Sequence, residues 1–359
     1  MGKDGSGLIG RSGTGPRTSV IVPTYNRARL LGEALESILA QSRPPLEILV
    51  VDDGSTDATR AVVAACGDRV RYLHQANAGV AAARNLGISA ARVEYVALLD
   101  SDDVWLPDHL EVTEDVLDAA PQAALVFTNF TELRGTQRGD APIEDKELFT
   151  VFRRWNLRLA DALPPAPPAA RGGDPLPFRL GDAAPLLFFG NFVLCSTVSA
   201  RRAALLAAGG FPAGWEFCED WDLFLRLARR QPFAYVERPT IGYRYHGDQA
   251  IDTVRSSRIR DLIVTVMERH ADLAARLPRR WRRLAAQRMA RVHTDRALAR
   301  VQAGDATGAR ADCRRALRHR ARDARAWGLA ALAWMPRPAL SLAVGLRHGL
   351  RDALQAAHR

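Results

Sequence analysis

Cysteine is scarce in this sequence, and no apolar run is long enough to cross a membrane. The 359 residues include four cysteines, Cys66, Cys195, Cys218 and Cys313, which lie far apart and form no CxxC pair. Such spacing excludes the close ligand pattern of a zinc site and indicates free thiols in a reducing compartment. The N-terminal residues are rich in glycine and serine where a secretory signal needs an apolar core. We therefore expect a soluble, cytoplasmic protein with a disordered tail over residues 1–17.

Acidic residues are also sparse in the last third of the chain. Residues 255–359 contain 24 arginines and 8 acidic residues, about +16, so the rest of the chain carries about −6 of the net +10. Arginine-rich helices attract nucleic acid or anionic lipid. A solvated helical face explains the same pattern, and we favour it, so no nucleic-acid partner is expected.

Short apolar runs alternate with segments of helical period from Ser19 to Thr128. The predicted strands are SVIVP, LEILVVD, VRYLH, YVALLD and ALVFT, and the helical segments between them include RLLGEALESILAQ and GVAAARNLGISAA. This alternation predicts an α/β, Rossmann-like fold with a mostly parallel sheet and flanking helices. Ligands of such sheets lie beyond the carboxyl ends of the strands.

The pattern breaks between residues 134 and 186. The run ALPPAPPAARGGDPLP, residues 162–177, predicts no regular structure, and we interpret the segment as an excursion over the site. Order resumes with the helical CEDWDLFLRLARR and then PFAYVERPTIGYRYH.

Residues 251–359 are predicted to form a basic, all-helical C-terminal region. Gly304 and Gly308 mark a turn between two helical segments, which resemble a single tetratricopeptide-type repeat. The last stretch, RPALSLAVGLRHGLRDALQAAHR, is amphipathic and basic. It could dock on the first domain or lie on the inner face of a membrane, and we favour docking.

Polar side chains gather at three predicted strand ends. These are the segments PTYNR from Pro23, DDGSTD from Asp52 and DSDD from Asp100. Like charges held together repel, and a divalent cation removes that cost. Carboxylates suit Mg²⁺ or Mn²⁺, which complete their coordination with phosphate oxygens and water, so DSDD indicates a diphosphate ligand.

Local structural roles explain part of the same pattern. Asp103 could cap the helix near Pro107, and Ser55 and Asp57 could cap the helix after DDGSTD. Asp52 and Asp53 leave an apolar strand where a carboxylate could accept hydrogen bonds from a base, and the ring of Tyr25 could stack on one.

Five motifs in order, SVIVPTYNR, ILVVDDGSTD, NAGVAAARNLGI, ALLDSDD and CEDWDLFLRL followed by YRYH, resemble the family 2 glycosyltransferases of bacteria. The resemblance covers residues 18–250 and implies a GT-A fold and a hexosyltransferase type of activity. It implies a nucleotide-diphosphate sugar donor, most commonly a UDP-sugar, a divalent metal, and inversion by direct displacement. The acceptor would be a glycan or a lipid-linked molecule of cell-surface polysaccharide synthesis, contacted through residues 134–186.

The resemblance also implies roles for individual residues. The nucleotide pocket would be lined by Pro23, Thr24, Tyr25 and Arg27, with Asp53 bonding the base and with Asn77, Gly79, Arg84 and Asn85 nearby. Asp100 would contact the ribose or sugar, with Ser101 beside it, and Asp102 would coordinate the metal. His246 matches a position that some relatives use as a further metal or diphosphate contact, although the serine that usually follows it is absent here.

Asp220 would be the general base, because inversion needs one carboxylate to accept the proton of the acceptor hydroxyl. Successive helical residues point about 100° apart, so Glu219, Asp220 and Asp222 cannot all face one site. We predict Asp222 to be a surface or helix-end charge. Glu219 either contacts the acceptor or raises the pKa of Asp220, and we favour the second role.

Two other classes of function compete with this interpretation. A nucleotidyltransferase would need a glycine-rich phosphate loop and a dehydrogenase a GxGxxG motif, and neither follows SVIVP. A scaffold that binds nucleic acid or membrane through its arginine-rich helices, with an inactive first domain, is the main alternative outside enzymes.

Overall fold

The computed structural model describes residues 17–134, 137–139, 141–146, 149–171, 174–245 and 257–334. The chain divides into two compact units, of which the first is Met1–Ala183 with Phe192–His246 and the second is Ala184–Asn191 with Gly247–Arg359. Most of the predicted N-terminal tail and the whole amphipathic stretch of residues 337–359 lie outside the described residues.

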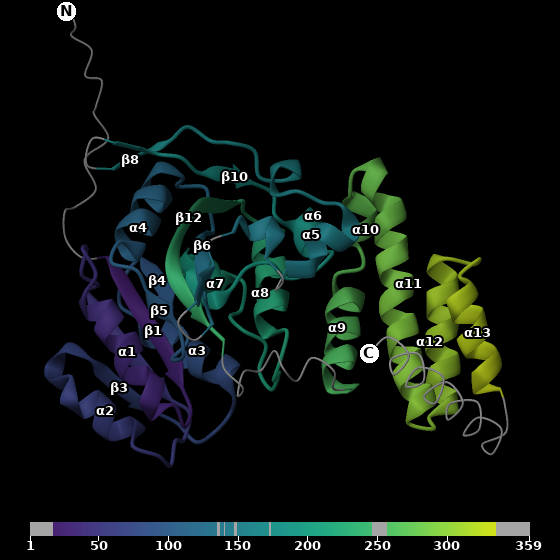
Figure 1. Ribbon diagram of the computed structural model, residues 1–359, viewed down its shortest axis with the longest axis horizontal. Helices are drawn as coiled ribbons and strands as arrows, with labels where there is room; N and C mark the ends of the chain where they lie inside the picture. Colours follow the sequence, from purple (N-terminus) through teal and green to yellow (C-terminus); the bar gives the residue numbers. More distant parts are fainter. Residues whose placement is uncertain are drawn as a thin grey trace, which may run out of the picture. The chain divides into compact units, whose positions relative to one another are not determined.

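The first unit is organised around one mixed sheet (Figure 1). Within the described residues this sheet has ten strands, eight of them in the order β10-β12-β6-β11-β4-β1-β2-β3, while β5 pairs with β12 and β7 with β6. The strands are β1 Thr18–Thr24, β2 Glu47–Asp52, β3 Arg71–His74, β4 Tyr95–Leu98, β5 Val104–Trp105, β6 Leu125–Arg134, β7 Gln137–Gly139, β10 Arg179–Gly181, β11 Val198–Arg201 and β12 Phe233–Arg244.

The first four strands are parallel, as predicted. In register, Ile21 of β1 lies between Leu49 of β2 and Leu98 of β4. All seven residues of β1 are buried, which is typical of a strand covered on both faces. Beyond β4 the sheet is mixed, because β11 runs antiparallel to both of its neighbours. The carboxyl ends of β1, β2 and β4 therefore share one edge of the sheet.

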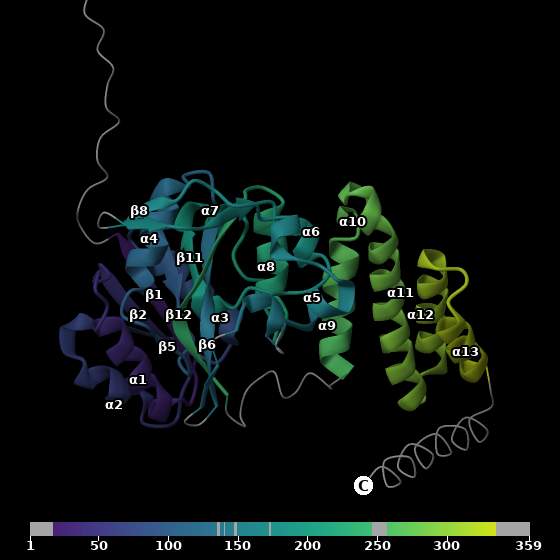
Figure 2. The same cartoon turned by 45° about the horizontal axis from the view of Figure 1, so that its top comes forward.

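Helices cover both faces of this sheet (Figures 1 and 2). They are α1 Ala28–Leu39, α2 Thr59–Ala65, α3 Val80–Ala90, α4 His109–Ala119, α5 Thr150–Trp155, α7 Arg202–Ala207 and α8 Glu219–Ala228. In α1 the buried residues Leu31, Leu35 and Ile38 recur at helical spacing and give the helix one apolar face. Helix α3 packs on β1 and β2, which places its side chains next to the carboxyl edge of the strands.

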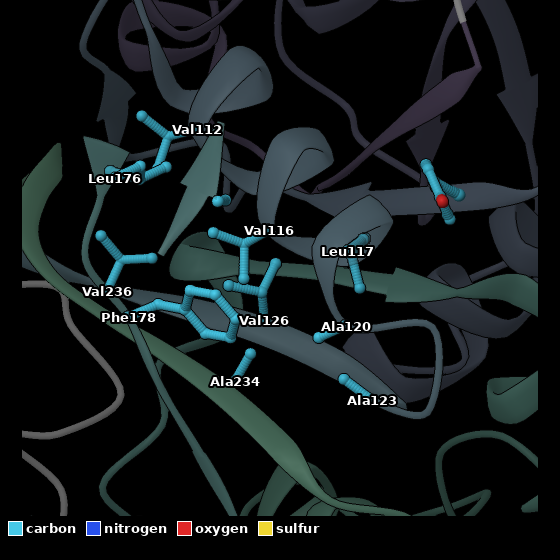
Figure 3. Close-up of a cluster of buried hydrophobic side chains, with 12 residues drawn as sticks. Val112, Val116, Leu117, Ala120, Ala123, Val126, Leu176, Phe178, Ala234 and Val236 are labelled. Carbon is cyan, nitrogen blue, oxygen red and sulfur yellow. The ribbon is translucent and has the colours of Figure 1, made fainter. Parts of the chain in front are cut away.

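The proline-rich run contains regular structure, contrary to the prediction. Within residues 162–177, β8 Ala169–Arg171 and β9 Asp174–Leu176 pair as an antiparallel hairpin. Leu176 and Phe178 pack against Val112 and Val116 of α4 (Figure 3). Burial of these apolar side chains compensates for the poor strand propensity of proline and glycine. The hairpin could not be predicted from the sequence, because a Pro-rich composition is typical of irregular segments.

The described part of the second unit is helical. Its helices are α6 Ala184–Leu187, α9 Ser257–Arg269, α10 Leu273–Arg276, α11 Arg279–Gln302, α12 Ala306–His319 and α13 Ala324–Ala333. The predicted turn between α11 and α12 is present: Gly304 has φ +78°, and the side chain of Asp305 accepts a hydrogen bond from the amide of Gly308 at 2.8 Å. Alanine side chains dominate the packing between these helices. Among the described residues, no helix combines the length and the apolar character needed to cross a bilayer.

Candidate functional site

The end of β2 is shaped by hydrogen bonds to Asp52. Its carboxylate accepts from the amide of Ser55 at 2.8 Å and from the hydroxyl of Tyr72 at 2.6 Å. Burial favours the neutral acid, but these hydrogen bonds outweigh it and lower the pKa of Asp52. Gly54 follows with φ +85°, where a side chain would be strained. Asp52 thus holds the turn that presents the next carboxylate.

Asp53 fastens the end of β2 to the beginning of α3. Its carboxylate accepts hydrogen bonds from the side chain of Gln75 at 2.6 Å and from the amides of Ala78 and Gly79 at 2.9 and 2.8 Å. Gly79 precedes α3 with φ +90°. The structure therefore brings Asp53, Asn77 and Gly79 together, as the sequence motifs suggested, and it adds Gln75, which sequence analysis missed.

The last residues of β1 and those just after it form the neighbouring wall. Thr24 is buried, and its carbonyl oxygen accepts a hydrogen bond from the amide of Asp53 at 2.9 Å. Tyr25 is 48% exposed, so much of the residue is accessible to solvent. Pro23 is buried and Arg27 is partly exposed. The four residues predicted to line a nucleotide pocket thus lie at the end of β1 and just after it, where Thr24 contacts Asp53.

Ser55 and Asp57 connect this wall to the next turn. The hydroxyl of Ser55 accepts from the amide of Asn26 at 2.9 Å, so Ser55 does not cap α2 as predicted. Asp57 accepts from the amide of Thr59 at the beginning of α2 and from that of Ala28 at the beginning of α1, both at 3.0 Å. One carboxylate therefore serves two helix N-termini, because both point at the same edge of the sheet.

The DSDD segment after β4 contains acids in different environments. Asp103 is 3% exposed and accepts hydrogen bonds from the hydroxyl of Ser196 at 2.6 Å and the amide of Arg244 at 3.1 Å. Burial, and then the charge of Asp102, raises the pKa of Asp103 well above its usual range. The suggested helix-capping role of Asp103 is therefore wrong: it ties the segment to β12. Asp100 and Asp102 are partly exposed and Ser101 is buried.

Ser196 is a site residue that sequence analysis missed. Its hydroxyl donates to Asp103 and accepts from the amide of Asp100 at 3.1 Å. The only signal for it is a small polar residue after an apolar run, in FVLCSTV, and that pattern is common in strands.

Arg84 connects the strand end to α8. Its side chain, 6% exposed, donates to Asp100 at 2.6 Å and to Glu219 at 2.8 Å. The guanidinium also lies 5.2 Å from the ring centre of Phe211. Burial disfavours the charge, but Asp100, Cys195 and Glu219 outweigh it, so the pKa of Arg84 is raised and it stays protonated. Neighbouring Asn85 exchanges two hydrogen bonds with the backbone of Phe211, each 2.8 Å long.

The acidic residues at the beginning of α8 point in different directions, as their helical spacing requires. Glu219 is buried against Arg84, whereas Asp220 is partly exposed. Burial, followed by the negative charge of Glu219, raises the pKa of Asp220 to about 7. Such a carboxyl group can accept or release a proton near neutral pH.

Asp222 lies in the first turn of α8, as the helix-end alternative predicted, but it is not a surface charge. It is completely buried and pairs with Arg226 at 2.8 Å. Arg226 also donates to the carbonyl oxygen of Gly210 at 2.7 Å. The helical spacing that turns Asp222 away from Asp220 points it into the protein, where Arg226 compensates its charge.

A complete cage of protein ligands for a metal ion is absent from the described residues: no three histidine, cysteine or acidic side chains come together suitably. A Mg²⁺ or Mn²⁺ ion bound by one or two carboxylates and by substrate phosphates fits this arrangement, because such ions keep several non-protein ligands. His246 lies outside the described residues, so its predicted role stays a prediction.

Comparison with known proteins finds glycosyltransferases. The sequence model described as glycosyl transferase family 2 matches residues 19–165. An uncharacterized glycosyltransferase of Rickettsia typhi is 38% identical over 238 residues, 66% of this chain and 67% of that protein. The glycosyltransferase GlyG of Streptococcus pneumoniae is 49% identical over 97 residues, 26% of this chain and 32% of GlyG. The match to a glycosyltransferase of Rickettsia felis spans 16% of that longer protein.

Solved structures show the same fold. The S. aureus TarS fragment 1–349 in complex with UDP-GlcNAc superposes with a TM-score of 0.54 at 17% identity, over 88% of this chain and 90% of that one. The same fragment in complex with UDP gives 0.50. The predicted GT-A fold with a helical C-terminal region is therefore confirmed. The chain belongs to glycosyltransferase family 2.

Proposed function

We propose that this glycosyltransferase moves a sugar from a UDP-sugar to an acceptor hydroxyl with inversion at the anomeric carbon, assisted by a divalent metal. The observation that carries the proposal is the arrangement around Asp220. A carboxyl group with a pKa of about 7 stands beside Glu219, which Arg84 links to Asp100 at the strand end. A group of that pKa is suited to general base catalysis at neutral pH.

The donor nucleotide would lie against the wall formed after β1 and β2. Tyr25 offers an accessible ring for stacking on the base. Asp53 already accepts three hydrogen bonds, and a carboxylate has room for about four, so one position is left for an N–H of the base. TarS binds UDP and UDP-GlcNAc in a structure of the same fold, which makes UDP-sugars the first donors to test.

A metal ion would be held by Asp102 and by the donor diphosphate. Asp102 is the acid of this segment that the sequence motif assigns to the metal, and it is partly exposed, whereas Asp103 is buried. When bound, Mn²⁺ or Mg²⁺ would neutralise charge on the departing diphosphate.

In the proposed reaction, the acceptor oxygen attacks the anomeric carbon while Asp220 takes its proton. The bond from that carbon to the diphosphate breaks, and the configuration inverts because attack and departure occur on opposite faces. Asp220 is partly exposed, and the proposal places the acceptor hydroxyl against its carboxylate. The acceptor is proposed to be a glycan or a lipid-linked precursor in cell-surface polysaccharide synthesis.

The helical unit could bring the enzyme to the inner face of a membrane. Trp327 and Trp334, at α13 and its C-terminal end, are 59% and 71% exposed, and tryptophan is common where proteins meet lipid headgroups. Sedimentation with vesicles rich in anionic lipid tests this part of the proposal. Loss of binding in Trp327→Ser/Trp334→Ser would support it, and failure of the wild-type protein to bind would refute it.

A thermal-shift screen of nucleotide sugars with and without Mn²⁺ tests the donor. A ligand at a hundred times its Kd stabilises a protein by about 2.7 kcal/mol, so the correct donor should raise the melting temperature clearly. With the responding donor, Asp220→Asn should lower kcat roughly 10²- to 10⁴-fold and leave donor affinity nearly unchanged. An unchanged kcat would exclude Asp220 as the base, and no response from any nucleotide sugar would count against the proposal as a whole.

A further inference from the structure

Arg84 binds two carboxylates that belong to different parts of the first unit. Asp100 follows shortly after the end of β4, and Glu219 is the first residue of α8, 135 positions after Arg84. The side chain of Glu219 is 9% exposed and that of Asp100 is 33% exposed. One buried guanidinium therefore connects the segment with the proposed metal ligand to the helix with the proposed base.

The guanidinium is held in a single orientation. Its fork is planar and donates in two fixed directions, which a lysine ammonium cannot reproduce. Phe211 packs against it, and Asn85 binds both the amide and the carbonyl oxygen of Phe211. Arg226 holds the preceding residue, Gly210, through its carbonyl oxygen. These contacts fix the loop that leads into α8.

We propose that Arg84 is a positioning residue that sets both the place and the ionisation of Asp220, and that Glu219 serves as its anchor without touching the acceptor. This inference rests on the proposed role of Asp220. It differs from the nucleotide contact that the family resemblance implies for Arg84, since both directions of the fork are occupied by protein carboxylates.

The charges around Asp220 explain how such control works. The groups that act on it include Glu219, Arg84 and Asp100 through their charges and the amide of Trp221, which donates to its carboxylate at 2.6 Å; the thiol of Cys195 is close enough to interact with it. The negative charge of Glu219 disfavours ionisation of Asp220, and the positive charge of Arg84 favours it. Removing Glu219 and removing Arg84 should therefore have opposite effects on the proton affinity of Asp220.

The test is a carboxyl ¹³C NMR titration of the full-length protein labelled with ¹³C-aspartate, in which Asp220→Asn identifies the signal. We expect Glu219→Gln to lower the pKa of Asp220 by about 1 or more. Adding Arg84→Gln to that variant should raise the pKa by about 1 or more. The Glu219→Gln background is needed because, without Arg84, Glu219 could take the proton itself.

Asp222→Asn is the matched control. It removes another buried carboxylate from the first turn of α8, and the charge of Asp222 is compensated by Arg226 at 2.8 Å. Asp222→Asn should lower the melting temperature and leave the pKa of Asp220 unchanged. A pKa that moves in the control as much as in Glu219→Gln, or that moves in neither test variant, overturns the proposal.

Arg84→Lys provides a second readout if the glutamine variants do not fold. It keeps the charge and loses the fork, so kcat with the responding donor should fall at least about tenfold. The Kd for UDP in the presence of Mn²⁺ should stay within about threefold, which corresponds to less than 1 kcal/mol. A tenfold weaker UDP affinity with kcat unchanged would make Arg84 a nucleotide contact and overturn the inference. The NMR titration needs no substrate, so it tests the role of Arg84 independently of the proposed function. The proposed function itself fails if Asp220→Asn retains normal turnover.

Discussion

At the scale of single residues, ionisation of Asp220 should control the pH dependence of transfer. Burial and the charge of Glu219 raise its pKa to about 7, and only the deprotonated form can accept a proton. The rate, as kcat/KM, should therefore increase with pH through about 7 and level off above it. A pH profile measured with the responding donor checks this, and a rate that is independent of pH between 5 and 9 would contradict it.

The raised pKa of Asp220 also predicts that its ionised carboxylate destabilises the folded protein. A carboxyl group whose pKa is higher in the folded state binds protons more tightly there, so the folded protein loses stability as pH rises from about 4 toward 7. Asp220→Asn, which resembles the protonated acid, should stabilise the protein by roughly 2 to 4 kcal/mol at pH 8 and much less at pH 5. Urea unfolding at the two pH values measures the difference, and equal effects at both would refute the prediction.

Asp102 should control the response to metal. If it is the protein ligand, Asp102→Asn should reduce the stimulation of donor turnover by Mn²⁺ by at least about tenfold, because the variant loses a charged ligand to the ion. Glu33→Gln is a suitable control, because Glu33 is an exposed acid of α1 that pairs with Arg244. Near-normal Mn²⁺ activation of Asp102→Asn would assign the metal to other groups.

At the scale of elements, the packing of α3 on β1 depends on one glycine. A β-carbon on Gly87 would lie 2.5 Å from Cγ2 of Ile21, which is buried in β1 and has a branched, stiff side chain. Helix propensity alone would make Gly87→Ala favourable by about 1 kcal/mol, but overpacking costs about 1 to 3 kcal/mol. We therefore expect a net loss of stability and lower activity, because α3 carries Arg84.

Gly32→Ala is the matched control for this helix prediction. Gly32 lies in α1, where the nearest neighbouring atom to an added β-carbon would be Cγ1 of Val62, 3.9 Å away. The substitution should be neutral or slightly stabilising by thermal denaturation. If Gly87→Ala is equally well tolerated, the close approach of α3 to β1 is not a constraint.

At the scale of the whole molecule, the helical unit depends on a buried charge cluster. Asp312 of α12 is completely buried and accepts hydrogen bonds from Arg296 at 2.6 and 2.9 Å and from Arg300 at 2.9 Å. Asp312→Asn should destabilise this unit by about 3 to 5 kcal/mol, because it removes the buried charge that pairs with Arg296 and Arg300. Hydrogen exchange should then increase in α11 and α12. Protection that is retained there would contradict the prediction.

The same cluster should make the helical unit sensitive to acid. Burial opposes ionisation of Asp312, but the neighbouring His293, the hydrogen bonds from Arg296 and the charges of Arg296 and Arg300 outweigh it and lower the pKa of Asp312 to about 2. A lowered pKa contributes stability that is complete above about pH 4 and is lost as pH falls toward 2. The contribution is about 2 kcal/mol, and helix-specific exchange between pH 5 and 2.5 measures it.

The amino-acid sequence by itself determined the strand and helix order of the first half and the residues at three strand ends. Apolar periodicity records which faces are buried, and parallel strands place their carboxyl ends at one edge, so the positions of Asp53, Asp100 and Asp102 just after strand ends could be predicted before the fold was known. The turn at Gly304 was also readable, because glycine and an N-capping aspartate are local signals.

Only the tertiary structure decided which partner each charged residue has. Asp222 and Asp103 look like exposed or capping acids in the sequence, yet both are buried. Asp222 is paired with Arg226 once α8 has packed. Asp103 accepts a hydrogen bond from Ser196, which lies far away in the sequence and which no local pattern connects to it. The hairpin in the proline-rich run likewise exists through its packing on α4. Hydrogen bonds and ion pairs between distant residues depend on the path of the whole chain, whereas periodicity and turns depend only on neighbours.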